Sequence, residues 1–146
     1  MRATGKPFPH DAMNIDELLA EARASLPPRP SPLEAATALQ DGAILVDIRE
    51  DDQRRRDGLI PGATLVPRNS LEWRCDPTSP WRHPSITDHD VRLILVCNQG
   101  YQSSLAAANL QRLGMHAATD VDGGFEAWRE AGLPILPFEL TAQSML

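Results

Sequence analysis

The sequence predicts an α/β fold built on a mainly parallel sheet, and two observations carry this prediction. Short apolar runs alternate with helix-forming segments along the chain, which is typical of a parallel sheet flanked by helices. The runs at residues 43–46 and 92–96 are almost continuously apolar, as expected of strands that are buried on both faces. A chain of 146 residues with 42% hydrophobic and 23% charged residues suits one such domain.

The N-terminal part is expected to form an arm with one amphipathic helix. Residues 1–13 show no periodic pattern and are expected to be loosely held. From Ile15 onward apolar residues recur at helical spacing, and Asn14 with Glu17 can cap the start of the helix. The prolines within residues 27–30 then force an extended connector.

A second helix has a clear beginning and end. Ser31 at the N-cap, Pro32 at the first helical position and Glu34 make a capping box, and Gly42 stops the helix. The elements expected after it are strands at 43–46, 64–66, 92–96 and 116–119, helices at 51–57, 68–74, 105–113 and 125–131, and a long loop over 75–90.

The stretch from Cys97 to Ser104 is the best candidate for a functional site. It follows the strand 92–96 directly and opens the helix 105–113. Backbone N–H groups at the start of a helix have no intrahelical partner, and the helix dipole adds positive charge there. A cysteine sulfur held over such groups is expected to be largely thiolate, the nucleophilic form. A lone cysteine at a strand end can also be a small buried hydrophobe, so both interpretations stand at this point.

The composition argues against several classes of protein. A net charge of −6 disfavours a nucleic-acid or anionic-membrane binder, and no apolar run approaches the roughly 20 residues of a membrane span. The N-terminus lacks the apolar core of a signal peptide, so a cytoplasmic location is expected. The histidines at 10, 83, 89 and 116 lack ligand spacing, so neither a metal nor another cofactor is expected. Two cysteines do not make a disulfide framework, and Cys75 is expected to be incidental.

Four segments together resemble the rhodanese-like (sulfurtransferase) family, in its single-domain form. They are 45–50 (Leu-Val-Asp-Ile-Arg-Glu), 58–63, 97–104 and 122–128 (Asp-Gly-Gly-Phe-Glu-Ala-Trp), in the order and at the spacing of the family. Gly58-Leu59 stands where the family usually has Gly-His. The resemblance implies a five-stranded, mainly parallel sheet with helices on both faces. It places the domain at 30–137, after an N-terminal arm at 1–29 and before a tail at 138–146.

The resemblance also implies a mechanism and a set of site residues. The Cys97 thiolate would attack the outer sulfur of a donor such as thiosulfate and become a persulfide. A second nucleophile, namely cyanide, a small thiol or a protein thiol, would then remove the sulfur in a two-step covalent mechanism. The residues implied to bind the substrate around Cys97 are Asn98, Gln99, Gly100, Tyr101, Gln102 and Ser103. Ser103 and Ser104 can instead cap the following helix.

Gln102 is the main departure from the family. Members that use thiosulfate well usually carry Arg or Lys at this position, and a neutral side chain attracts a dianionic donor less strongly. Arg49, Arg68 or Arg74 could supply the missing charge from neighbouring loops. Arg49 and Arg74 are the candidates to contact the substrate. For Arg49 a structural pair with Asp47 or another acid, which would anchor the site, is favoured, and a surface or structural ion pair is the alternative for Arg74.

Three other functions compete with sulfur transfer. A rhodanese-like module that binds a partner or regulates it, with little turnover, would also explain Gln102. A phosphatase or arsenate reductase is disfavoured because the loop after Cys97 is short and lacks arginine. A serine hydrolase is disfavoured because Ser103 lacks the Gly-x-Ser-x-Gly elbow.

Overall fold

The computed structural model describes residues 11–138 of the chain. Its strands are β1 (Ile44–Asp47), β2 (Thr64–Leu65), β3 (Leu93–Val96) and β4 (Thr119–Asp120). Its helices are α1 (Ile15–Ala24), α2 (Pro32–Gln40), α3 (Asp51–Asp57), α4 (Leu71–Arg74), α5 (Gln102–Arg112) and α6 (Gly124–Glu130), with a 3-10 turn at Arg68–Ser70. The loosely held start expected at residues 1–13 and the tail expected at 138–146 fall mostly on residues 1–10 and 139–146, which lie outside the described residues.

The strands form one parallel sheet in the order β2-β1-β3-β4. The predicted α/β architecture is therefore confirmed, but the number of five strands is wrong, because the sheet has four within residues 11–138. Leu59 and Leu136 form only an isolated antiparallel bridge beside it. Pro61 and Pro137 lie close to the bridge and have no N–H to donate, so the pairing cannot grow into a ladder.

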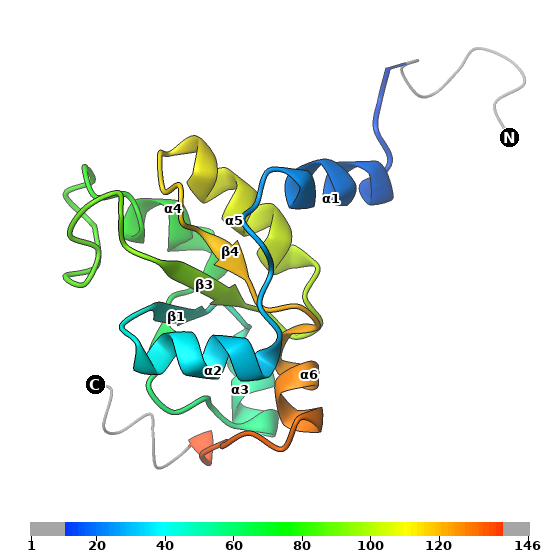
Figure 1. Cartoon of the computed structure of the whole chain (residues 1–146), viewed down its shortest axis with the longest axis vertical. Coiled ribbons are helices and arrows are strands. Elements are labelled where there is room, and N and C mark those ends of the chain that lie inside the picture. Colours follow the sequence, from blue (N-terminus) through cyan, green and yellow to red (C-terminus); the bar gives the residue numbers. More distant parts are fainter. Residues whose placement is uncertain (1–10, 139–146) are drawn as a thin grey trace, which may run out of the picture.

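Two apolar layers cover the two faces of the sheet, as predicted. Along β3 the side chains alternate: Leu93 and Leu95 belong to one core cluster, and Ile94 and Val96 belong to the other. The first cluster includes residues of α4 and α5, and the second includes residues of α2 and α6. Figure 1 shows α2 and α5 separated by the sheet. This sandwich fixes β1 and β3 at the centre of the molecule.

Local signals explain most helix boundaries. The capping boxes at Asn14 and Ser31 are both present, and Gly42 follows α2 with φ of 102°. Helix α5 begins at Gln102, three residues earlier than predicted, so the two serines at 103 and 104 lie inside its first turn. Strand β4 begins later than predicted, because the chain turns first: the N–H of Ala118 donates to the carbonyl of Met115.

The segment before the domain packs closely onto it. Helix α1 lies against α5, and the connector after α1 runs along β4 (Figure 1). The N–H of Asp122 donates to the carbonyl of Pro30 (2.9 Å), and the hydroxyl of Thr119 donates to the carbonyl of Pro27 (3.2 Å). Among the residues described here, no helix combines the length and the apolarity that crossing a membrane requires.

Candidate active site around Cys97

Cys97 lies at the carboxyl end of β3, beside the end of β1. Val96 pairs with Asp47 in the sheet register, and the N–H of Ile48 donates to the carbonyl of Val96 (3.0 Å). The chain leaves β1 toward β2 on one side and returns to β3 on the other. Ligands of open parallel sheets bind outside the carboxyl ends of the strands at such a switch point.

Two backbone N–H groups point at the sulfur of Cys97. The N–H of Gly100 donates to Sγ at 3.2 Å, and the N–H of Ser103 donates at 3.4 Å. Gly100 has φ of 86°, and a Cβ there would lie 2.9 Å from the backbone nitrogen of Gly123. Glycine is therefore needed for the loop to curl under the sulfur. The arrangement favours negative charge at Sγ, as converging amides do for other anions.

The side chain of Ser103 joins Cys97 to a buried carboxylate. Sγ donates to the Ser103 hydroxyl (3.2 Å), and that hydroxyl donates to Oδ2 of Asp120 (2.7 Å). The hydroxyl of Ser104 donates to the same Oδ2 (2.8 Å). Two roles were left open for these serines, binding the substrate or capping α5, and in the structure both hydroxyls donate to Asp120 instead. No side-chain bond caps α5 at Tyr101.

Two arginines from the N-terminal segment hold the other side of this network. Nε of Arg29 donates to Oδ1 of Asp120 (2.7 Å), and its Nη2 donates to the carbonyl of Gly100 (3.1 Å). Nη2 of Arg23 donates to the same carbonyl (2.7 Å), and its Nε donates to the Ser104 hydroxyl (3.1 Å). Burial by itself would lower the pKa of Arg29, but its hydrogen bond and charge pairing with Asp120 outweigh this and raise it.

Arg49 forms a buried structural pair. Its Nη2 donates to Oδ2 of Asp47 (2.9 Å) and to the carbonyl of Gly58 (2.7 Å), and both charged side chains are fully buried. The guanidinium carbon lies 3.8 Å from the centre of the Phe125 ring. Its Nη1 is buried and has no hydrogen-bond partner among residues 11–138.

A pocket of about 250 Å³ opens above Cys97. Its lining residues are Ile48, Arg49, Glu50, Gln53, Arg68, Cys97, Asn98, Gln99, Tyr101 and Gln102. Five of the residues predicted to bind substrate are thus brought to the pocket with Cys97, while Gly100 and Ser103 contact the sulfur itself. Tyr101 is exposed, and Arg23 lies over its ring.

Arg74 is not brought to this pocket. Its Nη1 donates to the carbonyl of Trp81 in the long loop (2.9 Å). Arg68 does line the pocket, and it pairs with Glu72 (2.9 Å). Of the three arginines considered from the sequence, Arg49 and Arg68 therefore line the pocket, but the side chain of Arg49 is fully buried in its pair with Asp47.

Cys75 has a different environment. Both cysteines border the apolar cluster that contains Leu71 and Ile86, but Cys75 is only 1% exposed and does not line the pocket above Cys97. Burial raises the pKa of the Cys75 thiol to about 12. Its thiol is therefore neutral at ordinary pH and a poor nucleophile.

Sequence reasoning missed Arg23, Arg29 and Asp120. Arg29 stands between prolines in a segment that reads only as a connector, and Asp120 follows a weak strand pattern. One signal was available for Asp120. A carboxylate at the carboxyl end of a parallel strand lies at the edge of the sheet where Cys97 lies.

Two proteins that transfer sulfur, by their names, are similar to this chain. The thiosulfate sulfurtransferase GlpE of Ectopseudomonas mendocina is 38% identical over 103 residues, which is 69% of this chain and 84% of the relative. The solved polysulfide-sulfur transferase homodimer of Wolinella succinogenes is 25% identical with a TM-score of 0.65, covering 81% of this chain and 83% of that one.

The similarity to a third protein covers a larger share of the chain. A solved protein of unknown function from Rhodopseudomonas palustris, named a possible tyrosine phosphatase, is 34% identical with a TM-score of 0.76. The match covers 88% of this chain and 99% of that one. This share is larger than residues 31–146 alone could supply, so the likeness extends into the segment before residue 31.

The family assignment follows from the sequence as well as from the site. Residues 31–131, more than half of the chain, match the sequence model of the Rhodanese-like domain. This range contains the sheet, Cys97 and Asp120, and it begins just after Arg29. The chain belongs to the Rhodanese-like domain family.

Proposed function

We propose that this protein is a sulfurtransferase that carries sulfane sulfur as a persulfide on Cys97. The observation that carries the proposal is the position of Sγ, which meets two backbone N–H groups and lines an open pocket. The names of the GlpE relatives support it. Cys97 is largely buried, but it keeps 9% of its surface exposed and lines the pocket, so a donor in the pocket can reach a thiolate that the amides stabilise.

The reaction divides into two displacements. In the first, the Cys97 thiolate attacks the outer sulfur of a donor such as thiosulfate, a new S–S bond forms, and sulfite leaves with the electrons of the broken bond. In the second, a thiolate or cyanide attacks the terminal sulfur and releases the Cys97 thiolate. Gly100 and Ser103 donate N–H groups toward the sulfur, and these groups can stabilise the anion in both states.

The charges around the pocket favour a donor of low charge. Arg49 is paired with Asp47 and Arg68 is paired with Glu72, while Glu50 adds a negative charge. The pocket therefore offers a dianion such as thiosulfate little net attraction. We infer that a persulfide of a small thiol or of a protein is a better donor than thiosulfate, and that a thiol is a better acceptor than cyanide.

We also infer a cytoplasmic location, without nucleic acid or membrane as a partner. Both cysteines are free. The cytoplasm keeps thiols reduced and so maintains Cys97 in its reactive form. Fractionation of cells that make the protein, with detection in the periplasmic or secreted fraction alone, would contradict this location.

Steady-state assays test the activity. Thiosulfate and a small-thiol persulfide are compared as donors, with cyanide and a small thiol as acceptors, for the wild type and for Cys97→Ser. We expect transfer that depends on Cys97 and a higher kcat/KM with the persulfide. The same preparations are assayed for hydrolysis of an aryl phosphate, and turnover there without sulfur transfer would favour the phosphatase named for the Rhodopseudomonas relative.

A further inference from the structure

We propose that Arg29 is a positioning residue for Cys97, so that the segment before the family domain completes the active site. We rest this inference on the proposed function of Cys97. Arg29 precedes the domain match at residues 31–131, but its guanidinium reaches the back of the Cys97 loop.

The first step concerns charge. The Asp120 carboxylate is fully buried and lies two hydrogen bonds from the sulfur, through the Ser103 hydroxyl. A lone carboxylate so close would disfavour a second negative charge on Cys97. Arg29 contacts both oxygens of Asp120, at 2.7 and 3.2 Å, and neutralises that charge. The amides that face Sγ can then stabilise a negative charge on the sulfur, because no unneutralised carboxylate opposes it.

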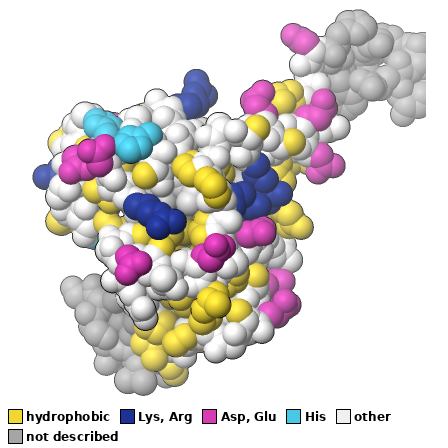
Figure 2. Space-filling view, in the orientation of Figure 1, with side chains coloured by type: hydrophobic (Ala, Val, Ile, Leu, Met, Phe, Trp, Pro, Cys, Tyr) yellow, Lys and Arg dark blue, Asp and Glu magenta, His cyan; other side chains and the backbone are white. Residues whose placement is uncertain are grey.

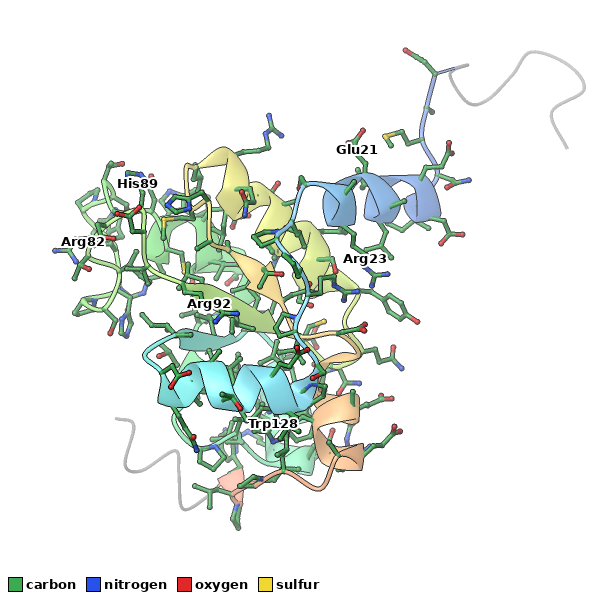
Figure 3. The ribbon with its side chains drawn as sticks, viewed as in Figure 1. Glu21, Arg23, Arg82, His89, Arg92 and Trp128 are labelled. Atoms are coloured by element: carbon green, nitrogen blue, oxygen red, sulfur yellow. The ribbon has the colours of Figure 1, made fainter. Side chains whose placement is uncertain are left out.

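The second step concerns geometry. Arg29 and Arg23 both donate to the carbonyl of Gly100, at 3.1 and 2.7 Å. The N–H of this same glycine donates to Sγ. Holding this carbonyl restrains the peptide unit between residues 100 and 101, which adjoins the unit that carries the Gly100 N–H, and so limits the rotation of the loop at Gly100. Figure 3 shows Arg23 reaching from α1 toward the start of α5, and basic side chains gather where α1 meets the body of the molecule (Figure 2).

The third step concerns position 102, where this chain has a neutral glutamine. Because position 102 carries no cation, the neutralisation of the Asp120 charge by Arg29 becomes more important for a negative charge on Cys97. Its side chain is only 17% exposed, so solvent screens its interaction with Asp120 weakly.

Other charged groups surround the site from the remaining elements. They are Asp122, which Nη1 of Arg29 also contacts (3.3 Å); Arg23, which donates to the Gly100 carbonyl; Arg49, paired with Asp47; Arg68, paired with Glu72; Glu50 at the pocket; and Glu126, which accepts from Asn98. The two pairs are neutral overall and are left unchanged by substitution at position 29. Asp122 is exposed whereas Asp120 is fully buried, so a change in the alkylation of Cys97 that is reversed by also replacing Asp120 reports on the Arg29–Asp120 pair.

The test is the pH dependence of Cys97 alkylation by iodoacetamide, in Cys75→Ala backgrounds so that one thiol is followed. In Arg29→Gln the Asp120 charge is uncompensated, and we expect the midpoint of the profile to rise by about one pH unit. The rate of persulfide formation near neutral pH should fall about tenfold. In Arg29→Gln/Asp120→Asn the charge is removed as well, and most of the rise should disappear. Arg92→Gln, at an exposed arginine, is the matched control and should leave the profile unchanged.

Arg29→Lys provides a second route if Arg29→Gln does not fold. Lysine keeps the charge but not the planar fork, so we expect a smaller rise than in Arg29→Gln and a partial loss of persulfide formation. A profile in Arg29→Gln within experimental error of the wild type would overturn the role of Arg29, and so would a double variant shifted as far as the single one. Alkylation needs no sulfur donor. A wild type that never forms a persulfide would refute the sulfurtransferase, while the alkylation profiles would still decide the role of Arg29.

Discussion

The Sγ atom of Cys97 lies 3.2 Å from the backbone nitrogen of Gly100, inside a loop that closes on the start of α5. The loop brings the end of a buried strand and the first turn of a helix around one sulfur. The amides lie on one side of it and the pocket lies on another.

The two cysteines should behave differently when replaced. Cys97→Ser is expected to abolish sulfur transfer, because a hydroxyl is not ionised at neutral pH and cannot form a persulfide. Cys75→Ser is expected to keep nearly all of the kcat, because Cys75 is buried away from the pocket. Transfer assays on both purified variants check this, and the reverse pattern would show that the wrong cysteine has been assigned.

Cys75 should also make the protein less stable in alkali. The pKa of its thiol is raised to about 12 in the folded protein from an ordinary 9.0, so the unfolded chain loses this proton first. The free energy of unfolding should therefore decrease as the pH rises above 9, by about 1.4 kcal/mol per pH unit from this group. Urea unfolding at several pH values, with Cys75→Ala as the control, measures the difference. Equal slopes in the two proteins would contradict the burial of this thiol.

Gln102→Arg is expected to improve the use of thiosulfate. Gln102 lines the pocket, and a hydrogen bond to a charged group exceeds a neutral one by roughly 1 kcal/mol, which corresponds to about a fivefold gain in kcat/KM. The gain should be smaller for a donor of lower charge, because only the dianion interacts strongly with the new cation. Kinetics that are unchanged or worse with thiosulfate would show that charge at this position does not limit the reaction.

The close packing behind the loop predicts that Gly124→Ala is inactive. A Cβ at Gly124 would lie 2.7 Å from the carbonyl oxygen of Cys97 and 2.7 Å from the nitrogen of Gly100. We expect more than a tenfold loss of kcat/KM, because the amide of Gly100 must move. Gly42→Ala is the control: Gly42 also has a positive φ (102°, against 63° at Gly124) but no atom within 4 Å of the new Cβ. It should cost about 1–2 kcal/mol of stability without loss of turnover, and similar activity losses in both variants would argue against the close approach.

The buried ion pair of Arg49 and Asp47 should contribute mainly to the stability of the fold. Arg49→Met leaves a buried carboxylate without its partner, and we expect the free energy of unfolding to fall by about 3–5 kcal/mol. Arg55→Met removes an exposed pair with Asp51 and should cost at most about 1 kcal/mol. Chemical denaturation of both variants measures the contrast. A small loss in Arg49→Met would mean that the pair serves mainly the substrate.

Local patterns in the sequence were sufficient to predict most strands, two helix starts and the position of the site. Apolar runs located β1, β2 and β3, whereas the strand expected at 116–119 overlaps β4 only at Thr119. The capping boxes at Asn14 and Ser31 located two helices. The position of Cys97 between strand and helix indicated the site. The start of α5 was placed too late, because Ser103 and Ser104 favour turns by propensity, whereas here their hydroxyls are engaged by Asp120.

Contacts between distant segments could not be obtained in this way. The bond from Arg29 to Asp120 joins positions 91 residues apart, and no periodic pattern links them. The same limit applied to the arginines near the site. Arg68 and Arg74 lie in one short predicted helix, yet only Arg68 lines the pocket. The prediction of five strands rested on the resemblance to the family and not on a strand pattern at Leu59 or Leu136. It was wrong, because these two residues form only an isolated bridge.

Intact-mass analysis after incubation with a sulfur donor tests the central claim most directly. The account predicts one added sulfur, located on Cys97 by peptide mapping, absent in Cys97→Ser and removed by cyanide or a small thiol. Cys75→Ala should gain the same mass. No added sulfur with any donor, or a sulfur located on Cys75, would contradict the account.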